Sequence, residues 1–178
     1  NTRACVFATL HGPATRLLMD LLEESGLVAM VGKVNMDRNA PDNLRESCPE
    51  AAELETRRWL DASAGRYERV TPILTPRFVP SCADDLMARL GELRREFDVP
   101  VQSHLSENQG EVALVQELCP WSRFYGDAYD RFGLFGGDHG CIMAHCVLSG
   151  DGEIALMKER GVYVAHCPQS NTNLASGI

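Results

Sequence analysis

The sequence predicts an α/β fold in which parallel strands alternate with helices. Six apolar runs of strand length are rich in Val and Ile, and amphipathic stretches separate them. Their nearly continuous apolarity is typical of a parallel sheet that is covered on both faces. The expected strands are residues 3–10, 28–36, 70–78, 99–107, 141–147 and 162–171.

The amphipathic stretches carry helix start and stop signals. Pro13 stands where a missing N–H costs little, and Gly26 and Gly161 can adopt the left-handed conformation that ends a helix. Ser81 is the expected N-cap of a later helix. The expected helices lie within residues 12–26, 81–98 and 151–161, whereas residues 119–140 are expected to be a loop elaboration.

Two architectures suit this alternation: an open doubly wound sheet and an eightfold barrel. A dinucleotide-binding sheet would carry G-x-G-x-x-G after its first strand, and the sequence lacks that pattern. A complete (β/α)8 barrel typically needs about 250 residues. The 178 residues leave room for roughly six strand–helix units, so a barrel interpretation predicts a single partial barrel domain over residues 1–178.

Composition and charge restrict the partners. The net charge of -8 disfavours binding to a nucleic-acid backbone or an anionic membrane surface. No apolar run has the length of a membrane span, and no signal peptide is recognisable. The seven scattered cysteines suit free thiols in a reducing compartment. We therefore expect a cytoplasmic protein with small-molecule partners.

Polar side chains recur near the carboxyl ends of successive expected strands. Those ends meet on one rim in a barrel, and barrel active sites are built there from residues of different strands. Each residue also has a structural alternative: a salt bridge for the arginine, a helix start for the glutamate, packing for the histidines. Their coincidence on one rim favours a site. The residues are Arg77, Phe78, His104, Glu107, His145, His166, Gln169 and Asn171, and His166 is expected to be structural or to support a neighbour.

An imidazole and a carboxylate three positions apart suit a hydrolytic metal site. Zinc lowers the pKa of its water to near neutral, and a carboxylate that is not a ligand can carry protons beside it. A catalytic zinc normally needs at least three protein ligands. The ligands beyond His104 must therefore come from outside residues 99–107.

Six short motifs are spread across nearly the whole chain: "FATLH" (7–11), "VGKVNMDRN" (31–39), "TPRF" (75–78), "SHLSEN" (103–108), "MAH" (143–145) and "AHCPQSN" (165–171). With these motifs the sequence resembles a known family, the zinc-dependent guanine deaminases of the amidohydrolase superfamily. Members of that family have a (β/α)8 fold, so the resemblance implies a partial TIM barrel of the amidohydrolase type.

The resemblance implies roles for the rim residues. His104 matches the zinc ligand at the end of the fifth barrel strand, and Glu107 matches the glutamate that moves protons. His145 matches the histidine that steadies the attacking water or the substrate. The residues implied to bind substrate are Arg77, Phe78, His104, Leu105, Ser106 and Glu107, with the arginine on the purine carbonyl and the phenylalanine stacked on the ring.

The implied enzyme is a C–N hydrolase that deaminates guanine to xanthine and ammonia with a metal-bound hydroxide, as a homodimer with one zinc per full-length subunit. The chain departs from the family by lacking the H-x-H pair of the first strand and the aspartate of the eighth. It is therefore expected to correspond to strands two to seven, to hold zinc poorly alone and to expose sheet edges. Cys146 stands where the family usually has Gly.

Two alternatives remain open on the sequence. A related amidohydrolase could act on cytosine, an adenosine-type compound or a triazine, and the Arg77–Phe78 pair is the discriminating feature. A non-catalytic barrel could serve as a binding platform, because the barrel fold does not fix function. The zinc deaminase fold with H-x-E and P-C-x-x-C is not indicated, since neither spacing occurs.

Overall fold

A computed structural model describes residues 2–177 and contains the six predicted strand regions, all in parallel pairing. Two of the six regions are divided into two short strands each. The strands are β1 (Arg3–Phe7), β2 (Val28–Gly32), β3 (Val34–Asn35), β4 (Val70–Pro72), β5 (Thr75–Pro76), β6 (Val101–Leu105), β7 (Cys141–His145) and β8 (Tyr163–Ala165).

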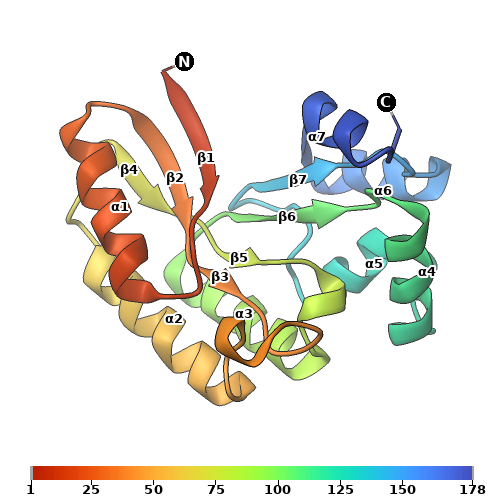
Figure 1. Ribbon diagram of the computed structural model, residues 1–178, viewed down its shortest axis with the longest axis horizontal. Coiled ribbons are helices and arrows are strands. Elements are labelled where there is room, and N and C mark those ends of the chain that lie inside the picture. Colours follow the sequence, from red (N-terminus) through yellow and green to blue (C-terminus); the bar gives the residue numbers. More distant parts are fainter. Residues whose placement is uncertain (1, 178) are drawn as a thin grey trace.

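The strands follow one another around an open, partial barrel (Figure 1). The three sheets have the strand orders β1-β2-β4, β3-β5 and β6-β7-β8, and a bridge between Leu74 and Val101 joins the third strand region to the fourth. Within the described residues, β1 and β8 have no strand on their outer sides. The exposed Tyr163 and Val164 confirm the predicted exposure of a sheet edge.

Proline explains why the strand region 70–78 is divided into β4 and β5. Pro72 and Pro76 pair with Val31 and Asn35, and a proline has no N–H to give to the ladder. Gly32 marks the other division, because a Cβ there would lie 1.7 Å from Thr75 Oγ1. The backbone of the second strand region therefore approaches the third more closely than a side chain would permit.

The helices cover the outer side of the strands, with α1, α2 and α3 beside β1 to β5 and the later helices beside β6 to β8 (Figure 1). Gly26 and Gly161 adopt positive φ values of 76° and 67°, which confirms both predicted helix ends. The helices are α1 (Gly12–Glu24), α2 (Pro49–Ser63), α3 (Asp84–Phe97), α4 (Gln109–Leu118), α5 (Tyr125–Asp130), α6 (Asp151–Arg160) and α7 (Pro168–Asn173), with 3-10 turns η1 (Asp42–Leu44) and η2 (Val79–Ser81).

Three local predictions are wrong. Ser81 lies in η2, and the N-cap of α3 is Ala83, whose N–H donates to Asp37 Oδ1 at 2.8 Å. The strand predicted to run to residue 171 stops at Ala165, because Pro168 begins α7. The stretch predicted as loop, residues 119–140, contains α5.

A continuous apolar core lies between helices and strands. The inner face of α3 contributes Leu86, Leu90 and Leu93, each 0% exposed, at the helical spacing that the sequence pattern predicts. Burying a leucine side chain stabilises the fold by about 1.5–3 kcal/mol. No helix in residues 2–177 combines the length and the apolarity that a membrane crossing demands. All seven cysteines are free thiols, as predicted.

Replacement of Leu90 by Ala should lower the free energy of unfolding by about 2–5 kcal/mol, because the fully buried side chain leaves a cavity. Leu54→Ala on α2 is the matched control: that side chain is 47% exposed and the same change should cost less than about 1 kcal/mol. Urea unfolding of both variants measures the difference. Equal losses would contradict the placement of α3 in the core.

Candidate active site

His104 stands at the end of β6 with its imidazole oriented by a neighbouring strand. Its Nδ1 lies 2.6 Å from the carbonyl oxygen of Arg77, which follows β5. Because a carbonyl oxygen only accepts, Nδ1 carries the proton and Nε2 keeps a free lone pair. Burial lowers the pKa of His104, and the hydrogen bond to Arg77 opposes that shift. The imidazole is therefore neutral near pH 7, which is the form that binds metal.

His145 stands at the end of β7, beside His104. The two rings stack with centroids 5.4 Å apart. His145 has φ +74° and Cys146 has φ +54°, a conformation that favours glycine. This strained turn aims the imidazole, and it explains why a glycine would suit position 146. His145 Nδ1 lies 2.8 Å from Asn171 Oδ1 and 3.4 Å from Glu107 Oε1.

Glu107 completes a cluster with the two histidines. Its side chain is 15% exposed, and Oε1 has no hydrogen-bond partner among the described residues. The preceding residue, Ser106, has φ +46°, which turns the chain sharply between β6 and α4. A buried carboxylate oxygen without a donor is costly and is a typical sign of a group that acts on a ligand.

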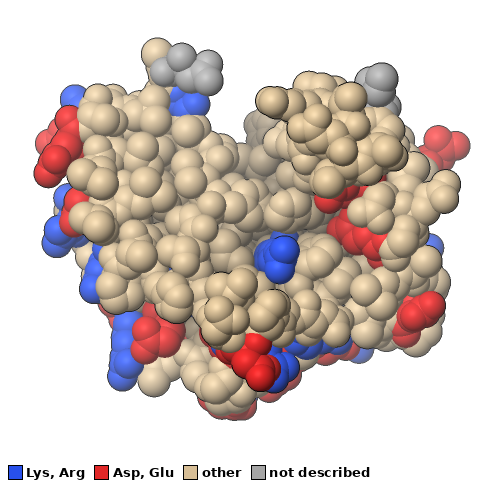
Figure 2. All heavy atoms as spheres, in the orientation of Figure 1, with Lys and Arg blue, Asp and Glu red and all other residues tan. Residues whose placement is uncertain are grey.

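A hollow of about 290 Å³ opens beside this cluster and includes both Arg77 and His104 among its lining residues. Figure 2 shows this face hollowed near its centre, with most charged side chains toward its margin. The Arg77 guanidinium lies 5.3 Å from the centre of the Phe78 ring. The lining residues are Phe7, Ala8, Thr9, Leu10, Val34, Met36, Leu44, Arg77 and His104.

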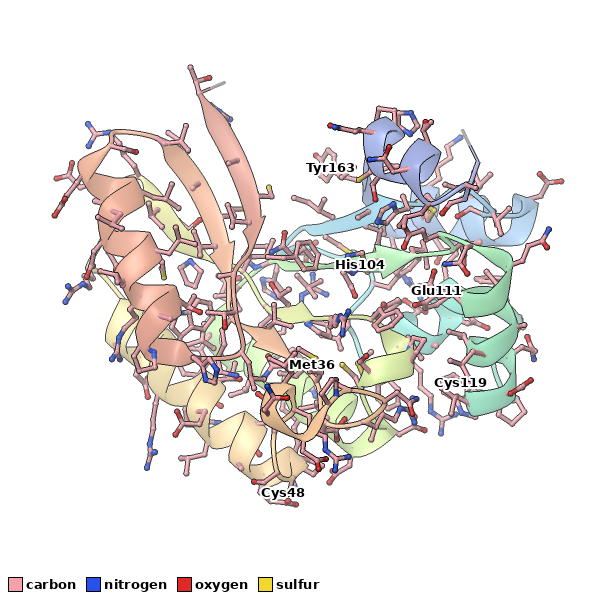
Figure 3. The ribbon with its side chains drawn as sticks, in the orientation of Figure 1. Met36, Cys48, His104, Glu111, Cys119 and Tyr163 are labelled. Atoms are coloured by element: carbon pink, nitrogen blue, oxygen red, sulfur yellow. The ribbon has the colours of Figure 1, made fainter. Side chains whose placement is uncertain are left out.

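Two distant sequence motifs form one structural unit along this hollow. Residues 35–39 of "VGKVNMDRN" form hydrogen bonds with "TPRF" and with the segment that directly follows it. Arg77 N–H donates to the Asn35 carbonyl at 3.0 Å, and the Arg38 guanidinium donates to the Val79 carbonyl at 2.8 Å. This pairing holds Met36 against the hollow, where its sulfur lies 3.7 Å from Arg77 Nη1 (Figure 3).

A buried ion pair closes the loop that carries Met36. Lys33 Nζ lies 2.6 Å from Glu46 Oε1, with side-chain exposures of 2% and 7%. The same carboxylate accepts from Asn35 Nδ2 and from the Met36 N–H, each at 2.8 Å. One glutamate therefore neutralises a buried lysine and fixes both Met36, which lines the hollow, and the neighbouring Asn35. A buried charge of this kind requires its partner.

The structure brings Arg77, Phe78, His104, Glu107 and His145 together, as predicted. Leu105 and Ser106 are buried beside them, and the Ser106 hydroxyl donates to Glu153 at 2.8 Å. Contact of these two residues with substrate stays a prediction. His166 is exposed and lines a second hollow together with His145 and Cys146.

Sequence reasoning assigned no role to Phe7 or to Asn171, although Asn171 stands among the polar residues of the last expected strand end. The Phe7 ring lies 4.7 Å from the His104 ring, and Asn171 accepts from His145. Both residues belong to motifs that carry the family resemblance, "FATLH" and "AHCPQSN". That membership was the available signal, because neither residue type alone indicates chemistry at a strand end.

The donor chemistry suits a zinc site in part. The free Nε2 of the neutral His104 is a suitable ligand. Over residues 2–177, however, no group of three or more His, Cys, Asp or Glu side chains is placed to hold a metal ion. His104 would therefore be one ligand of a set that these residues do not complete.

Comparison with known proteins places this geometry in a family. A model of the amidohydrolase family matches residues 2–178. The chain is 41% identical to human guanine deaminase and 40% identical to a probable guanine deaminase of Schizosaccharomyces pombe, over all of this chain in both cases. It covers 39% and 34% of those two proteins.

A structure of guanine deaminase from C. acetobutylicum with guanine bound in its active site is similar along the whole chain. The sequence identity is 48% and the TM-score is 0.96, and this chain covers 42% of that one. The chain belongs to the amidohydrolase family. The predicted partial (β/α)8 barrel is confirmed, because the fold matches while the chain spans about two fifths of the relatives' length.

Replacement of Glu46 by Ala should lower the free energy of unfolding by about 3–5 kcal/mol, because it leaves the Lys33 charge buried and unpaired. The double change Lys33→Met with Glu46→Gln should recover most of that loss, since it removes both charges. Urea unfolding measures each variant.

The matched control is Glu55→Ala, which breaks an exposed pair with Arg58 and should cost less than about 1 kcal/mol. A Glu46→Ala loss no larger than that of the control would show that the buried pair does not hold the loop.

Proposed function

We propose that the protein hydrolyses guanine to xanthine and ammonia, and that this chain supplies the purine-facing and proton-moving residues. The observation that carries the proposal is the Arg77–Phe78 pair beside His104: Arg77 and His104 line one hollow, and the Phe78 ring lies 6.3 Å from the His104 ring. The similarity to guanine deaminases over the whole chain, including one with guanine bound, supports the choice of substrate.

Arg77 and Phe78 suit recognition of a flat purine. The Arg77 side chain is exposed at the hollow, and its guanidinium presents donors in a plane that matches the guanine carbonyl. The half-buried Phe78 ring offers an aromatic face for stacking. A substrate without that carbonyl would leave the Arg77 donors unpaired, which is a basis for discrimination.

Glu107 is the residue proposed to move protons. Its free Oε1 can accept a proton from the attacking water as the C2–oxygen bond forms. The same carboxyl can then deliver that proton to a ring nitrogen of the purine. The second hydrogen of the water passes to the amino group as the C2 carbonyl forms and the C2–nitrogen bond breaks, so the amino group leaves as ammonia. Atoms balance as guanine plus water giving xanthine plus ammonia.

His145 is proposed to steady the water or the substrate. Asn171 Oδ1 accepts the Nδ1 proton, so Nε2 is left as an acceptor. The stacked His104 ring fixes the plane in which that acceptor lies. His145 can therefore orient a water by accepting one of its hydrogens.

His104 is proposed to hold zinc through Nε2, with further ligands from outside the described residues. When bound, zinc acts as a Lewis acid that makes water nucleophilic near neutral pH. Its presence, a homodimer and a cytoplasmic location remain predictions.

The full-length gene product that carries residues 1–178 should convert guanine to xanthine, with adenine and cytosine as comparison substrates and metal content measured on the same sample. Guanine turnover with about one zinc per chain would support the proposal. Bound zinc with turnover of another heterocycle would show that the protein is a related amidohydrolase with a different substrate. A protein that binds no zinc and converts none of the three substrates would favour the non-catalytic barrel.

Glu107→Gln in that protein should retain metal and lower kcat by at least about a hundredfold, because the amide cannot accept the proton of water. The matched control is Glu117→Gln on the exposed side of α4, which should keep wild-type turnover. Steady-state kinetics and metal analysis measure both variants. Wild-type kcat in Glu107→Gln would remove this residue from the mechanism.

A further inference from the structure

Helix α5 (Tyr125–Asp130) lies in the connection 119–140 and has no part in the chemistry proposed above. It nevertheless forms hydrogen bonds with three groups next to the catalytic cluster: the Glu111 carboxylate, the Glu153 carboxylate and the His104 carbonyl. Tyr125 and Tyr129 are 3% and 0% exposed, and their rings stack with centroids 5.7 Å apart. Gly126 lies between them, where a Cβ would meet the Phe135 ring at 2.8 Å.

The first contact reaches Glu107 through one buried carboxylate. The Tyr125 hydroxyl donates to Glu111 Oε1 at 2.7 Å, and Glu111 Oε2 accepts the Glu107 N–H at 3.0 Å. Glu111 lies on the first turn of α4 (Figure 3). The Glu111 N–H donates to Oδ1 of Asn108, the N-cap of that helix, at 2.9 Å. Burial raises the pKa of Glu111, and the bond from Tyr125 opposes that shift.

The second contact reaches the same turn through another buried carboxylate. Gly126 N–H donates to Glu153 Oε1 at 2.7 Å, and the Ser106 hydroxyl donates to Glu153 Oε2 at 2.8 Å. Among residues 2–177, neither Glu111 nor Glu153 forms an ion pair with a Lys or Arg side chain. Both buried carboxylates depend on neutral donors, so loss of one donor weakens the other contacts they make.

The third contact reaches His104. The Tyr129 hydroxyl donates to the His104 carbonyl at 2.8 Å, lies 2.8 Å from Ser103 Oγ and accepts the Val79 N–H at 3.2 Å. Val79 directly follows the Arg77–Phe78 pair. One hydroxyl therefore joins the end of β6 to the segment that carries the purine contacts.

We propose that α5 positions the catalytic residues, with Tyr125 acting through Glu111 on Glu107 and Tyr129 acting on the backbone of His104. Tyr125, Glu111 and Tyr129 are positioning residues, since none reaches the hollow. The left-handed Ser106 needs such supports, because a non-glycine residue in that conformation persists only where its surroundings hold it. This inference rests on the proposed role of Glu107.

The test is Tyr125→Phe, which removes one hydroxyl and keeps the stacked ring. The matched control is Tyr67→Phe, which removes a hydroxyl that donates at 2.8 Å to Asp20 Oδ1 on α1, a residue outside the cluster of His104, Glu107 and His145. Amide hydrogen exchange at Glu107 is measured first, and it needs neither substrate nor metal. Guanine kinetics follow on the full-length gene product.

Tyr125→Phe should accelerate Glu107 amide exchange and lower kcat, each by about tenfold, with KM changed less than twofold, because a small displacement of a catalytic group affects the chemical step. Tyr67→Phe should change neither. Glu111→Ala should act in the same direction and more strongly, whereas Glu111→Gln should restore much of both, since the amide oxygen can still accept the Glu107 N–H.

Unchanged exchange and unchanged kcat in a folded Tyr125→Phe protein would overturn the proposal, as would Glu111→Gln behaving like Glu111→Ala. A wild-type protein that leaves guanine unconverted would contradict the proposed function alone. The exchange rate of the Glu107 amide would then still decide whether α5 holds the turn.

Discussion

The hydrogen bond between His104 Nδ1 and the Arg77 carbonyl is the contact on which the site depends. It joins the carboxyl ends of two neighbouring strand regions, and it sets both the tautomer and the orientation of the imidazole. The same residue whose backbone orients His104 presents its guanidinium to the hollow. A single interaction therefore couples the proposed metal ligand to the proposed purine contact, so the two cannot shift independently.

Buried charge surrounds this contact and makes the rim rigid. The Lys33–Glu46 pair closes the loop that carries Met36, and Glu111 and Glu153 brace the turn before Glu107. Buried carboxylates are tolerated only with donors in place, so each one imposes a geometry on the backbone that supplies those donors. The rim is thus built from polar groups that have few alternative arrangements, which suits a site that must hold reacting groups in place.

Membership of the amidohydrolase family fits a barrel whose active rim is assembled from many strands. This chain contributes the strand ends that carry His104, Glu107 and His145, and it spans about two fifths of its guanine deaminase relatives. Residues 2–177 bring together no group of three side chains that could hold a metal ion, which fits an architecture in which each barrel strand supplies only one or two residues to the centre. In the proposed function, this chain supplies the residues for substrate recognition, Arg77 and Phe78, and the residue for proton transfer, Glu107.

Periodicity and punctuation in the sequence were sufficient to predict the six parallel strand regions, the glycine helix ends and the gathering of His104, Glu107 and His145 on one rim. Those features arise from local patterns, because strand ends in a parallel sheet fall on the same side wherever the strands lie. The sequence did not show that α5 supports the turn, that Asn171 holds His145 or that Glu46 neutralises Lys33. Tyr125 and Glu111 are 14 positions apart, Lys33 and Glu46 are 13 apart, and His145 and Asn171 are 26 apart, and no periodic signal marks these contacts. Their geometry exists only once the strands and helices have packed, since burial is what makes each lone donor and acceptor require a particular partner.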